Sequence, residues 1–263
     1  MKMIAVIVSD KNQAEQSRLQ SEALAEKLSL PIIDSNQASD YEFVLFYEAG
    51  VLKLIHQADK KMGAVYVDFS KGKSAYRQKH QGKGKLPLSR ACGIKQSNRP
   101  TIIDATAGLG QDAFVLAGLG CQVLCIEQHP VLSTLLADGL VRAKEGESWL
   151  REITGNMTLI SAQAETVLAT QKADVIYLDP MYPHEQNRKQ AKVNKGMQLF
   201  RAFPGTSSNE SELLKSAIAA ATDRVVVKRP DWASPLADQK PSYEVPGKTH
   251  RYDVYKIELL QGS

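Results

Sequence analysis

The chain has 263 residues, of which 43% are hydrophobic and 24% are charged, and its formal net charge is +4 at pH 7. This length allows one large domain, or a large domain with a small one, and the apolar content is typical of a globular core. No apolar run reaches the roughly 20 residues that are needed to cross a bilayer, so we expect no membrane-spanning helix.

The first eight residues are mostly apolar, but Ser9-Asp10 ends this run before it reaches the length of a signal peptide's apolar core. We therefore predict a first strand in a cytoplasmic protein. The three cysteines, Cys92, Cys121 and Cys125, have no histidine or cysteine partner at metal-binding spacing. We expect them to be buried structural thiols, and we expect no metal.

Residues 1–69 are predicted to form a small N-terminal α/β domain. Apolar residues at helical spacing indicate a helix over 13–28, and short apolar runs indicate strands over 3–8, 32–33, 43–47 and 64–69. None of these segments carries a chemical motif, so the sequence predicts no function for this domain.

Residues 70–99 are strongly basic and are predicted to be a loop or linker. Nine lysines and arginines lie between Ser70 and Ile103, with no aspartate or glutamate. Glycines, Tyr76 and His80 are interspersed among them, which favours a flexible loop that binds nucleic-acid phosphates over a merely solvated linker. The residues expected to contact phosphates are Lys71, Lys73, Arg77, Lys79, Lys83 and Lys85.

From residue 100 onward, predicted strands and helices alternate, which indicates a mostly parallel, doubly wound sheet with both faces covered. Pro100 disfavours helix at Arg99 and marks the start of this domain, which extends over 100–263. The predicted strands cover 101–104, 122–127, 157–160, 174–178 and 224–228, the helices 112–119, 130–143, 165–170 and 210–222, and two closing strands 242–245 and 251–260.

The first strand of this domain leads into a glycine turn. Asp104 ends the strand, Gly108 and Gly110 follow, and a helix begins at once. Glycines let the backbone approach a ligand, and the start of a helix offers unpaired N–H groups. The run from Gly108 to Ala113 also fits the dinucleotide fingerprint G-x-G-x-x-G/A. The turn alone therefore predicts a nucleotide pocket and leaves the cofactor open.

Polar residues follow the next two strands, at the edge where an open parallel sheet binds its ligand. Glu127 lies 19 residues after Gly108, the position from which an acidic side chain binds ribose hydroxyls. Residues 161–164 follow the third strand, where a base edge can be bound. Together with the glycine turn, these residues indicate one pocket.

The fourth strand ends in Asp179-Pro180-Met181-Tyr182, and this tetrapeptide indicates the chemistry. The Asp179 carboxylate and the Pro180 carbonyl can accept both hydrogens of a nucleobase amine and direct the nitrogen lone pair toward an electrophile. Tyr182 can stack on the ring, which is worth roughly 1–3 kcal/mol. With a sulfonium methyl opposite, a direct displacement depends mainly on positioning and desolvation. An ordinary Asp-Pro turn is the structural alternative.

Four segments closely resemble the RsmJ family: D-A-T-A-G-L-G-Q-D-A-F-V-L-A (104–117), Y-L-D-P-M-Y-P-H (177–184), R-V-V-V-K-R-P (224–230) and H-R-Y-D-V-Y (250–255). The resemblance extends over 65–257. It implies a class I methyltransferase fold in a bacterial cytoplasmic protein. It also implies transfer of a methyl group from S-adenosylmethionine to the exocyclic N2 of a guanosine near the 3′ end of 16S ribosomal RNA.

The chemistry of the residues predicts Asp179, Pro180 and Tyr182 as the catalytic residues, and Gly108 and Asp104 at the methionine end of the cofactor. The resemblance implies the cofactor contacts Gln111, Asp112, Glu127, Gln128, Gln163, Ala164 and Asp179. The chain departs from the expected pattern at Gln111, where we expect an arginine, and at Gln163-Ala164, where we expect two small hydroxyl residues.

A second basic run follows Tyr182 and includes Arg188, Lys189, Lys192 and Lys195. We expect it to contact the RNA backbone, with a mobile, merely solvated loop as the alternative. Lys228-Arg229-Pro230, after the fifth strand, is expected to border the same site. Three other functions stay open: an adenine-N6 methyltransferase, a nicotinamide-dependent oxidoreductase supported only by the glycine turn, and a non-catalytic RNA-binding factor that retains the pocket.

Overall fold

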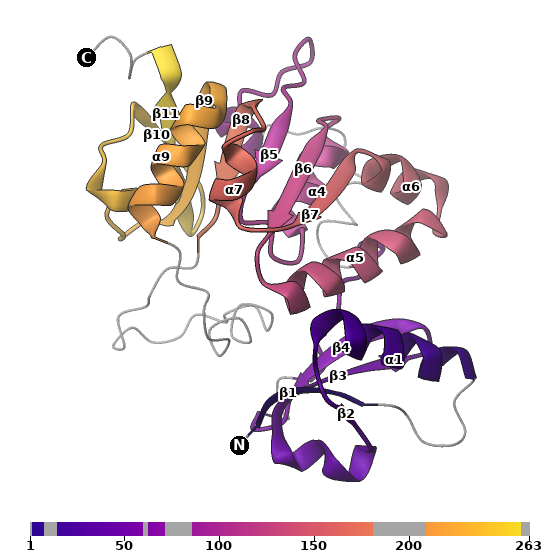
Figure 1. Cartoon of the computed structure of the whole chain (residues 1–263). Helices are drawn as coiled ribbons and strands as arrows, with labels where there is room; N and C mark the ends of the chain where they lie inside the picture. Colours follow the sequence, from indigo (N-terminus) through magenta and orange to yellow (C-terminus); the bar gives the residue numbers. More distant parts are fainter. Residues whose placement is uncertain (1, 8–14, 60–62, 72–85, 181–208, 259–263) are drawn as a thin grey trace. The chain divides into compact units, whose positions relative to one another are not determined.

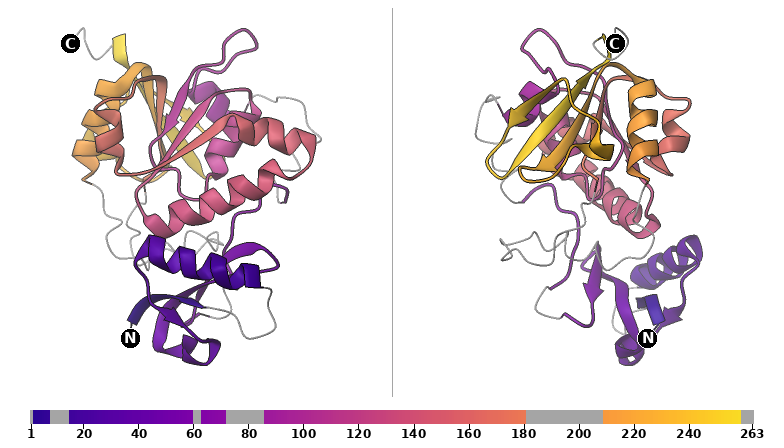
Figure 2. Two further views of the ribbon diagram at one scale, coloured as in Figure 1. Left: turned by 45° about the vertical axis from the view of Figure 1, so that its right-hand side comes forward. Right: turned by 90° about the vertical axis from the view of Figure 1, so that its left-hand side faces the viewer.

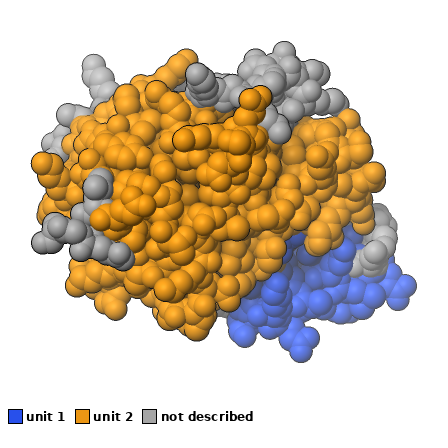
Figure 3. Space-filling model, turned by 90° about the horizontal axis from the view of Figure 1, so that it is seen from above, with its two compact units in different colours: residues 1–68, 137–139, 185–204 blue, residues 69–136, 140–184, 205–263 orange. Residues whose placement is uncertain are grey.

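The computed structural model describes residues 2–7, 15–59, 63–71, 86–180 and 209–258. The chain divides into two compact units (Figure 3). Among the described residues, unit 1 contains those up to 68 and residues 137–139, and unit 2 contains the rest. Residues 86–99 of the predicted linker are grouped with unit 2. Each unit is described by itself.

Unit 1 is a four-stranded sheet with the order β2-β1-β3-β4 (Figure 1). Strand β1 is parallel to β2 and β3, and β3 is antiparallel to β4. Small and apolar side chains of Ala5, Ile33, Tyr41 and Val44 form a core on it. In chain order the elements are β1 (Lys2–Ile7), α1 (Glu15–Leu28), β2 (Ile32–Ile33), the 3-10 helix η1 (Ser35–Asp40), β3 (Tyr41–Glu48) and β4 (Val51–His56).

The structure corrects the sequence prediction at the β3–β4 hairpin, because a strand covers 51–56 and none covers 64–69. Ala49 and Gly50 connect β3 and β4 with φ angles of +50° and +74°. Two residues of positive φ are typical of a tight hairpin turn, but alanine rarely occupies the first position, so the sequence gives little sign of it. Val65 forms only an isolated bridge with Leu54.

Unit 2 is built on a seven-stranded sheet with the order β10-β11-β9-β8-β5-β6-β7. Strands β5 to β9 are parallel, and β11 is antiparallel to both β9 and β10. Strand β5 has β6 on one side and β8 on the other, so the order of connection reverses there, and such a reversal places the ligand crevice beyond the carboxyl ends of the strands. The strands are β5 (Ile102–Asp104), β6 (Val123–Glu127), β7 (Met157–Ser161), β8 (Ala173–Leu178), β9 (Ala221–Pro230), β10 (Tyr243–Pro246) and β11 (His250–Lys256).

Helices cover both faces of this sheet (Figure 2), which confirms the predicted Rossmann-like class I fold. Helices α7 (Ala164–Leu168) and α9 (Glu210–Ala220) pack on one face over a core that includes Ile103, Ile176 and Val225. Tyr177 points to the opposite face and contacts α4 (Gln111–Gly118) there. The remaining helices include α5 (Pro130–Lys144), which was predicted, and three short helices that were not. These are α3 (Pro87–Ala91), which lies inside the predicted loop over 70–99, α6 (Ser148–Gly155) and the 3-10 helix η3 (Leu236–Asp238).

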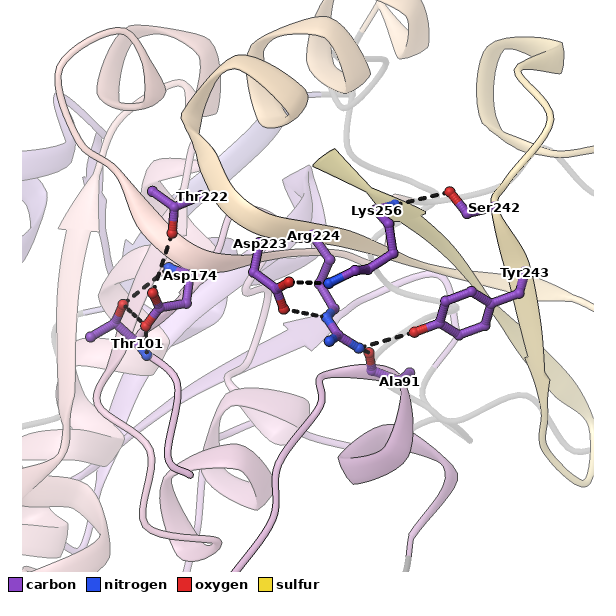
Figure 4. Close-up of polar contacts among 9 residues, drawn as sticks. All are labelled: Ala91, Thr101, Asp174, Thr222, Asp223, Arg224, Ser242, Tyr243 and Lys256. Atoms are coloured by element: carbon purple, nitrogen blue, oxygen red, sulfur yellow. Dashed lines mark hydrogen bonds and ion pairs between the residues drawn. The ribbon is translucent and has the colours of Figure 1, made fainter. Parts of the chain in front are cut away.

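Asp174 joins the amino ends of three neighbouring strands, away from the crevice (Figure 4). Its carboxylate accepts hydrogen bonds from the backbone N–H and the hydroxyl of Thr101, both at 2.8 Å, and from the hydroxyl of Thr222 at 3.2 Å. The bonds from Thr101 lower the pKa of Asp174. The three cysteines are buried and unpaired, as predicted.

Arg224 connects β9 to α3 and β10 at the same edge (Figure 4). Its guanidinium donates to the Asp223 carboxylate at 2.6 Å, to the Ala91 carbonyl at 3.1 Å and to the Tyr243 hydroxyl at 3.0 Å. Lys256 of β11 also binds Asp223. These bonds hold the guanidinium in one position against the residues that follow α3.

Gly93 lies directly against this guanidinium and is expected to tolerate no side chain. A Cβ there would lie 2.9 Å from Arg224 Cζ, and Gly93 has a φ of +68°. Gly93→Ala should lower the free energy of unfolding by about 2 kcal/mol, because a left-handed alanine costs about 1–2 kcal/mol and Arg224 must move. Gly155→Ala is the matched control, since no atom of the described residues lies within 4 Å of its Cβ. Urea unfolding curves measure both variants, and equal midpoints would contradict the prediction.

Candidate active site

The crevice at the carboxyl edge of unit 2 contains the glycine turn between β5 and α4. Gly108 and Gly110 have φ angles of +54° and +74°, which residues with side chains rarely adopt. A Cβ on Gly110 would lie 2.7 Å from Leu136 Cδ1, whereas a Cβ on Gly108 would have no atom of the described residues within 4 Å. Packing therefore requires glycine at 110, and the backbone at Gly108 is open to a ligand.

Glu127, the last residue of β6, holds this turn in place. The residue is 7% exposed, and its carboxylate accepts hydrogen bonds from the backbone N–H groups of Gly108 at 2.8 Å and His129 at 2.7 Å. Burial raises the pKa of Glu127, and the backbone N–H groups oppose this rise. Because a carboxylate can accept about four hydrogen bonds, Glu127 retains acceptor capacity for the hydroxyls of a ligand.

Lys228, near the end of β9, bridges two carboxylates. Its Nζ donates to Oδ2 of Asp112 and to Oδ2 of Asp179, each at 2.8 Å. The Tyr177 hydroxyl donates to Asp112 Oδ2 at 2.6 Å. We call Asp112, Tyr177, Asp179 and Lys228 the ion-pair cluster. It joins the start of α4 to the ends of β8 and β9, on the face of the sheet that α4 covers.

Burial and mutual interaction set the charges of the ion-pair cluster. Burial raises the pKa of Asp179, and although Lys228 lowers it, the pKa stays above its usual value. Burial also raises the pKa of Asp112, but Lys228 and Tyr177 outweigh burial and lower it. Burial lowers the pKa of Lys228, but the two carboxylates raise it above its usual value. Lys228 is therefore a stable cation that favours the ionised forms of both carboxylates.

Asp104, at the end of β5, lies beneath this cluster and is 2% exposed. Its Oδ1 accepts a hydrogen bond from the Thr106 N–H at 3.2 Å. The Thr106 hydroxyl accepts a hydrogen bond from the Asp179 N–H at 2.6 Å, which links the glycine turn to the end of β8. Burial, and next the charge of Asp112, raise the pKa of Asp104 well above its usual value. The charge of Lys228 opposes this rise, and a ligand cation beside Asp104 would oppose it further.

The antiparallel strand β11 adds two ring side chains next to the cluster. Tyr252 pairs in register with Lys228, and His250 pairs with Pro230. The imidazole Nε2 of His250 lies 2.9 Å from the Tyr252 hydroxyl. Burial, and next the charge of Lys228, lower the pKa of His250, so its neutral form is favoured at neutral pH.

The structure brings Asp104, Gly108, Asp112, Glu127 and Asp179 together at one edge. Of the other predicted site residues, Gln111, Gln128 and Gln163 have exposed side chains, Pro180 is half-buried and Ala164 is buried at the start of α7. Tyr182 lies outside the described residues, as do all the predicted phosphate contacts except Lys71, which is exposed.

The bridging role of Lys228 was not predicted. The segment around it was expected to border the site, but no carboxylate was expected to pair with the lysine. Tyr177 and Thr106 were also missed, because a tyrosine inside an apolar strand and a threonine in a turn usually indicate packing and turn formation. The sequence sign that could have identified them is their distance from predicted site residues. Tyr177 lies two residues before Asp179, and Thr106 lies two residues after Asp104.

Three further observations concern metal sites, membrane-spanning helices and other cavities in the described residues. Among the described residues, there is no cluster of three or more His, Cys, Asp or Glu side chains that could hold a metal ion. In the same part of the chain, no helix combines the length and the apolar character that a membrane span requires. A shallow hollow of about 260 Å³ lies at the opposite, amino edge of the sheet, where Thr101, Gln122 and Lys172 line it. It is separate from the crevice.

The sequence of the chain is similar to those of known methyltransferases, whose fold has a nucleotide crevice at this edge of the sheet. A family model described as "Putative SAM-dependent methyltransferase" matches residues 23–257, where SAM is S-adenosylmethionine. Ribosomal RNA small subunit methyltransferase J of Thioalkalivibrio sulfidiphilus is 44% identical over 252 residues, which cover 94% of this chain and 97% of that protein. The protein of the same name from Aeromonas hydrophila is 45% identical over 248 residues, which cover 92% of this chain and 95% of that protein.

A solved structure supports the same grouping. The crystal structure of a SAM-dependent methyltransferase from Neisseria gonorrhoeae is 32% identical, covers 96% of each chain and superimposes with a TM-score of 0.72. The chain therefore belongs to the ribosomal RNA small subunit methyltransferase J (RsmJ) family and uses S-adenosylmethionine as its cofactor.

Proposed function

We propose that the protein transfers a methyl group from S-adenosylmethionine to the exocyclic N2 of a guanosine near the 3′ end of 16S ribosomal RNA, in the bacterial cytoplasm. The names of the relatives support small-subunit ribosomal RNA as the substrate. The observation that carries the choice of an exocyclic amine is the position of Asp179 at the carboxyl edge of the sheet. Its carboxylate accepts a hydrogen bond from Lys228, and its backbone N–H donates to the Thr106 hydroxyl next to the glycine turn.

The residues at the glycine turn fit the cofactor. When bound, S-adenosylmethionine supplies an electrophilic methyl group on a sulfonium centre. The open backbone at Gly108 and the start of α4 suit its amino-acid end, and Asp104 suits its ammonium, because a cation there would offset the burial of the carboxyl. The Glu127 carboxylate suits the ribose hydroxyls. We propose Gln111, Asp112, Gln128, Gln163 and Ala164 as the remaining contacts.

In this proposal Asp179 orients the amine and keeps it reactive. Its Oδ2 accepts from Lys228, and its Oδ1 and the Pro180 carbonyl accept the two amine hydrogens, so the nitrogen lone pair points toward the methyl group. Tyr182 stacks on the guanine ring. Methylation makes the nitrogen strongly acidic, so Asp179 or water can take its proton without a tuned base. Positioning in a desolvated site then supplies most of the rate enhancement.

The domain roles belong to the same proposal. Residues 100–263 carry out the transfer, residues 70–99 form a basic segment that binds RNA, and residues 1–69 form a separate small domain. The proposed phosphate contacts are Lys71, Lys73, Arg77, Lys79, Lys83, Lys85, Arg188, Lys189, Lys192 and Lys195.

Glu127→Ala is expected to weaken cofactor binding. The variant loses the charged acceptor for the ribose hydroxyls and the bonds that hold Gly108. Hydrogen bonds to a charged group are worth roughly 1.5–3 kcal/mol each, so the Kd for S-adenosylmethionine should rise on the order of 10- to 100-fold. Isothermal titration calorimetry measures it, with Glu152→Ala on α6, which is exposed, as the control. A Kd within twofold of the parent value would remove Glu127 from the cofactor site.

The proposed reaction is tested with labelled S-adenosylmethionine and small ribosomal subunits from a strain that lacks this modification. We expect label in the ribosomal RNA and N2-methylguanosine in its nucleoside digest. Label in N6-methyladenosine would favour the adenine alternative. RNA that binds without transfer would favour the non-catalytic factor. Running the assay with free ribosomal RNA in parallel shows which form is the substrate.

A further inference from the structure

A turn after β9 exposes a large aromatic side chain at the carboxyl edge of the sheet. Strand β9 ends at Pro230, and the Ala233 N–H donates to the Pro230 carbonyl at 3.0 Å, which closes a turn over 230–233. Trp232 in this turn is 40% exposed, whereas Ala233 beside it is 6% exposed. A tryptophan left exposed on a fixed turn is typical of a binding surface, because its ring offers a large apolar area and a polar N–H.

Two buried arginines hold this turn. Arg229, which is 2% exposed, donates Nε and Nη2 to the Ser234 carbonyl at 3.0 and 2.8 Å. Arg251, which is 8% exposed, donates Nη1 to the carbonyls of Pro230 at 3.0 Å and Asp231 at 3.1 Å. The backbone on both sides of the tryptophan is therefore fixed by charged donors before a ligand arrives. An aromatic residue on such a support loses little conformational entropy on binding.

This turn borders the proposed active site. Pro230 lies two residues beyond Lys228 on β9, and Lys228 binds Asp179. Pro230 also pairs with His250. The His250 imidazole lies 2.9 Å from the hydroxyl of Tyr252, which pairs in register with Lys228. Strand pairing therefore places the turn next to the ion-pair cluster, so neighbouring nucleotides of one RNA strand can reach both the turn and the amine site.

We infer that Trp232 stacks on an unpaired base of the RNA next to the target guanosine. This inference rests on the proposed function, because it takes RNA as the substrate. The ligand is a base and not a phosphate, since both guanidinium groups of the turn are buried and bound to protein oxygens. Among the described residues of the turn, the exposed charge is the carboxylate of Asp231. That carboxylate repels a phosphate, but it can accept a hydrogen bond from the edge of a stacked base.

The two tryptophans of the chain, Trp149 and Trp232, allow a direct optical test. Trp149 lies on α6, so Trp149→Phe leaves Trp232 as the sole indole. Titration of this variant with an unmodified transcript of the 3′ region of 16S ribosomal RNA should quench its fluorescence, because a stacked base quenches indole. Trp232→Phe carries only Trp149 and should show little quenching with the same transcript. Equal quenching in both variants would overturn the inference.

Steady-state kinetics provide the second test. Trp232→Ala should raise the KM for the RNA substrate by about 10- to 100-fold, as expected for one lost base–aromatic contact. It should leave kcat and the Kd for S-adenosylmethionine near the parent values, and Trp232→Phe should restore most of the KM. Val141→Ala, which truncates an exposed apolar residue of α5, is the matched surface control.

These outcomes separate the inference from the proposed function. If the parent protein methylates the RNA and Trp232→Ala has an unchanged KM, the inference is wrong and the proposed function stands. If the parent protein neither binds nor methylates the transcript or the small subunit, both are wrong. If Trp232→Ala lowers the melting temperature and Trp232→Phe fails to restore the KM, the tryptophan has only a structural role and the inference is overturned.

Discussion

Asp179→Ala is expected to abolish methyl transfer while S-adenosylmethionine still binds. The variant removes the carboxylate that accepts the amine hydrogen but keeps the glycine turn and Glu127, whose hydrogen bond at 2.8 Å does not involve Asp179. Loss of one preorganised polar contact in a desolvated site costs about 100-fold or more in rate. Single-turnover transfer of labelled methyl groups to small subunits measures the rate, and calorimetry measures cofactor binding.

Two further variants make this result specific. Asp179→Asn keeps an acceptor oxygen of similar position and should retain part of the activity, because an amide oxygen also accepts a hydrogen bond. Asp238→Asn makes the same change at an exposed site in η3 and should have no effect. Full activity of Asp179→Ala would exclude the proposed mechanism. Loss of cofactor binding in Asp179→Ala would instead place Asp179 in the cofactor site alone.

Lys228→Met should shift the pH dependence of activity and lower activity at neutral pH. Burial already raises the pKa of Asp179, and Lys228 lowers it, so removal of the ammonium raises that pKa further. The carboxylate then takes up a proton at higher pH than in the parent. Because the ionised carboxylate is a stronger hydrogen-bond acceptor than the neutral acid, the acid limb of the kcat/KM profile should move to higher pH, with a loss of about 10-fold or more at pH 7.

The controls for this prediction separate charge from packing. Lys228→Arg keeps a cation that can bind carboxylates and should leave the acid limb near its parent position. Lys256→Met removes a similar ion pair, with Asp223, at the other end of β9 and should leave the profile unchanged. An unchanged acid limb in Lys228→Met would show that the lysine does not control the ionisation of Asp179.

Much of the fold could be predicted because its signals are local. Gly108 and Gly110 have the positive φ angles that their placement after a strand predicts. The alternation of strands and helices after residue 100 predicts a doubly wound sheet, and the seven-stranded sheet of unit 2 confirms this prediction. The prediction was wrong at β4, where the turn residue Ala49 has an unusual positive φ, and it missed the short helices α3 and α6. An alanine in the first turn position gives no local sign of the β3–β4 hairpin, and α3 lies inside the basic segment that was predicted to be a loop.

The candidate site could be predicted only in part. The strand ends at Asp104, Glu127 and Asp179 follow from local pattern, because parallel strands place their carboxyl ends at one edge. The burial of two arginines could not be predicted, because arginine is mostly exposed in proteins and no local pattern marks Arg229 or Arg251 as buried. In the structure their guanidinium groups are buried, and they hold the backbone beside Trp232.

The sequence alone determined the family resemblance, the glycine turn and the order of the parallel strands along the chain, since each depends on neighbouring residues. Only the tertiary structure decided how the charges pair. Lys228 meets Asp112 and Asp179, which lie 116 and 49 residues away from it. These contacts exist because β9 pairs with β8 and because α4 covers that face of the sheet. A cation and two carboxylates that are far apart in sequence become neighbours only after folding, and in the folded cluster Lys228 lowers the pKa of Asp179 against the rise that burial causes.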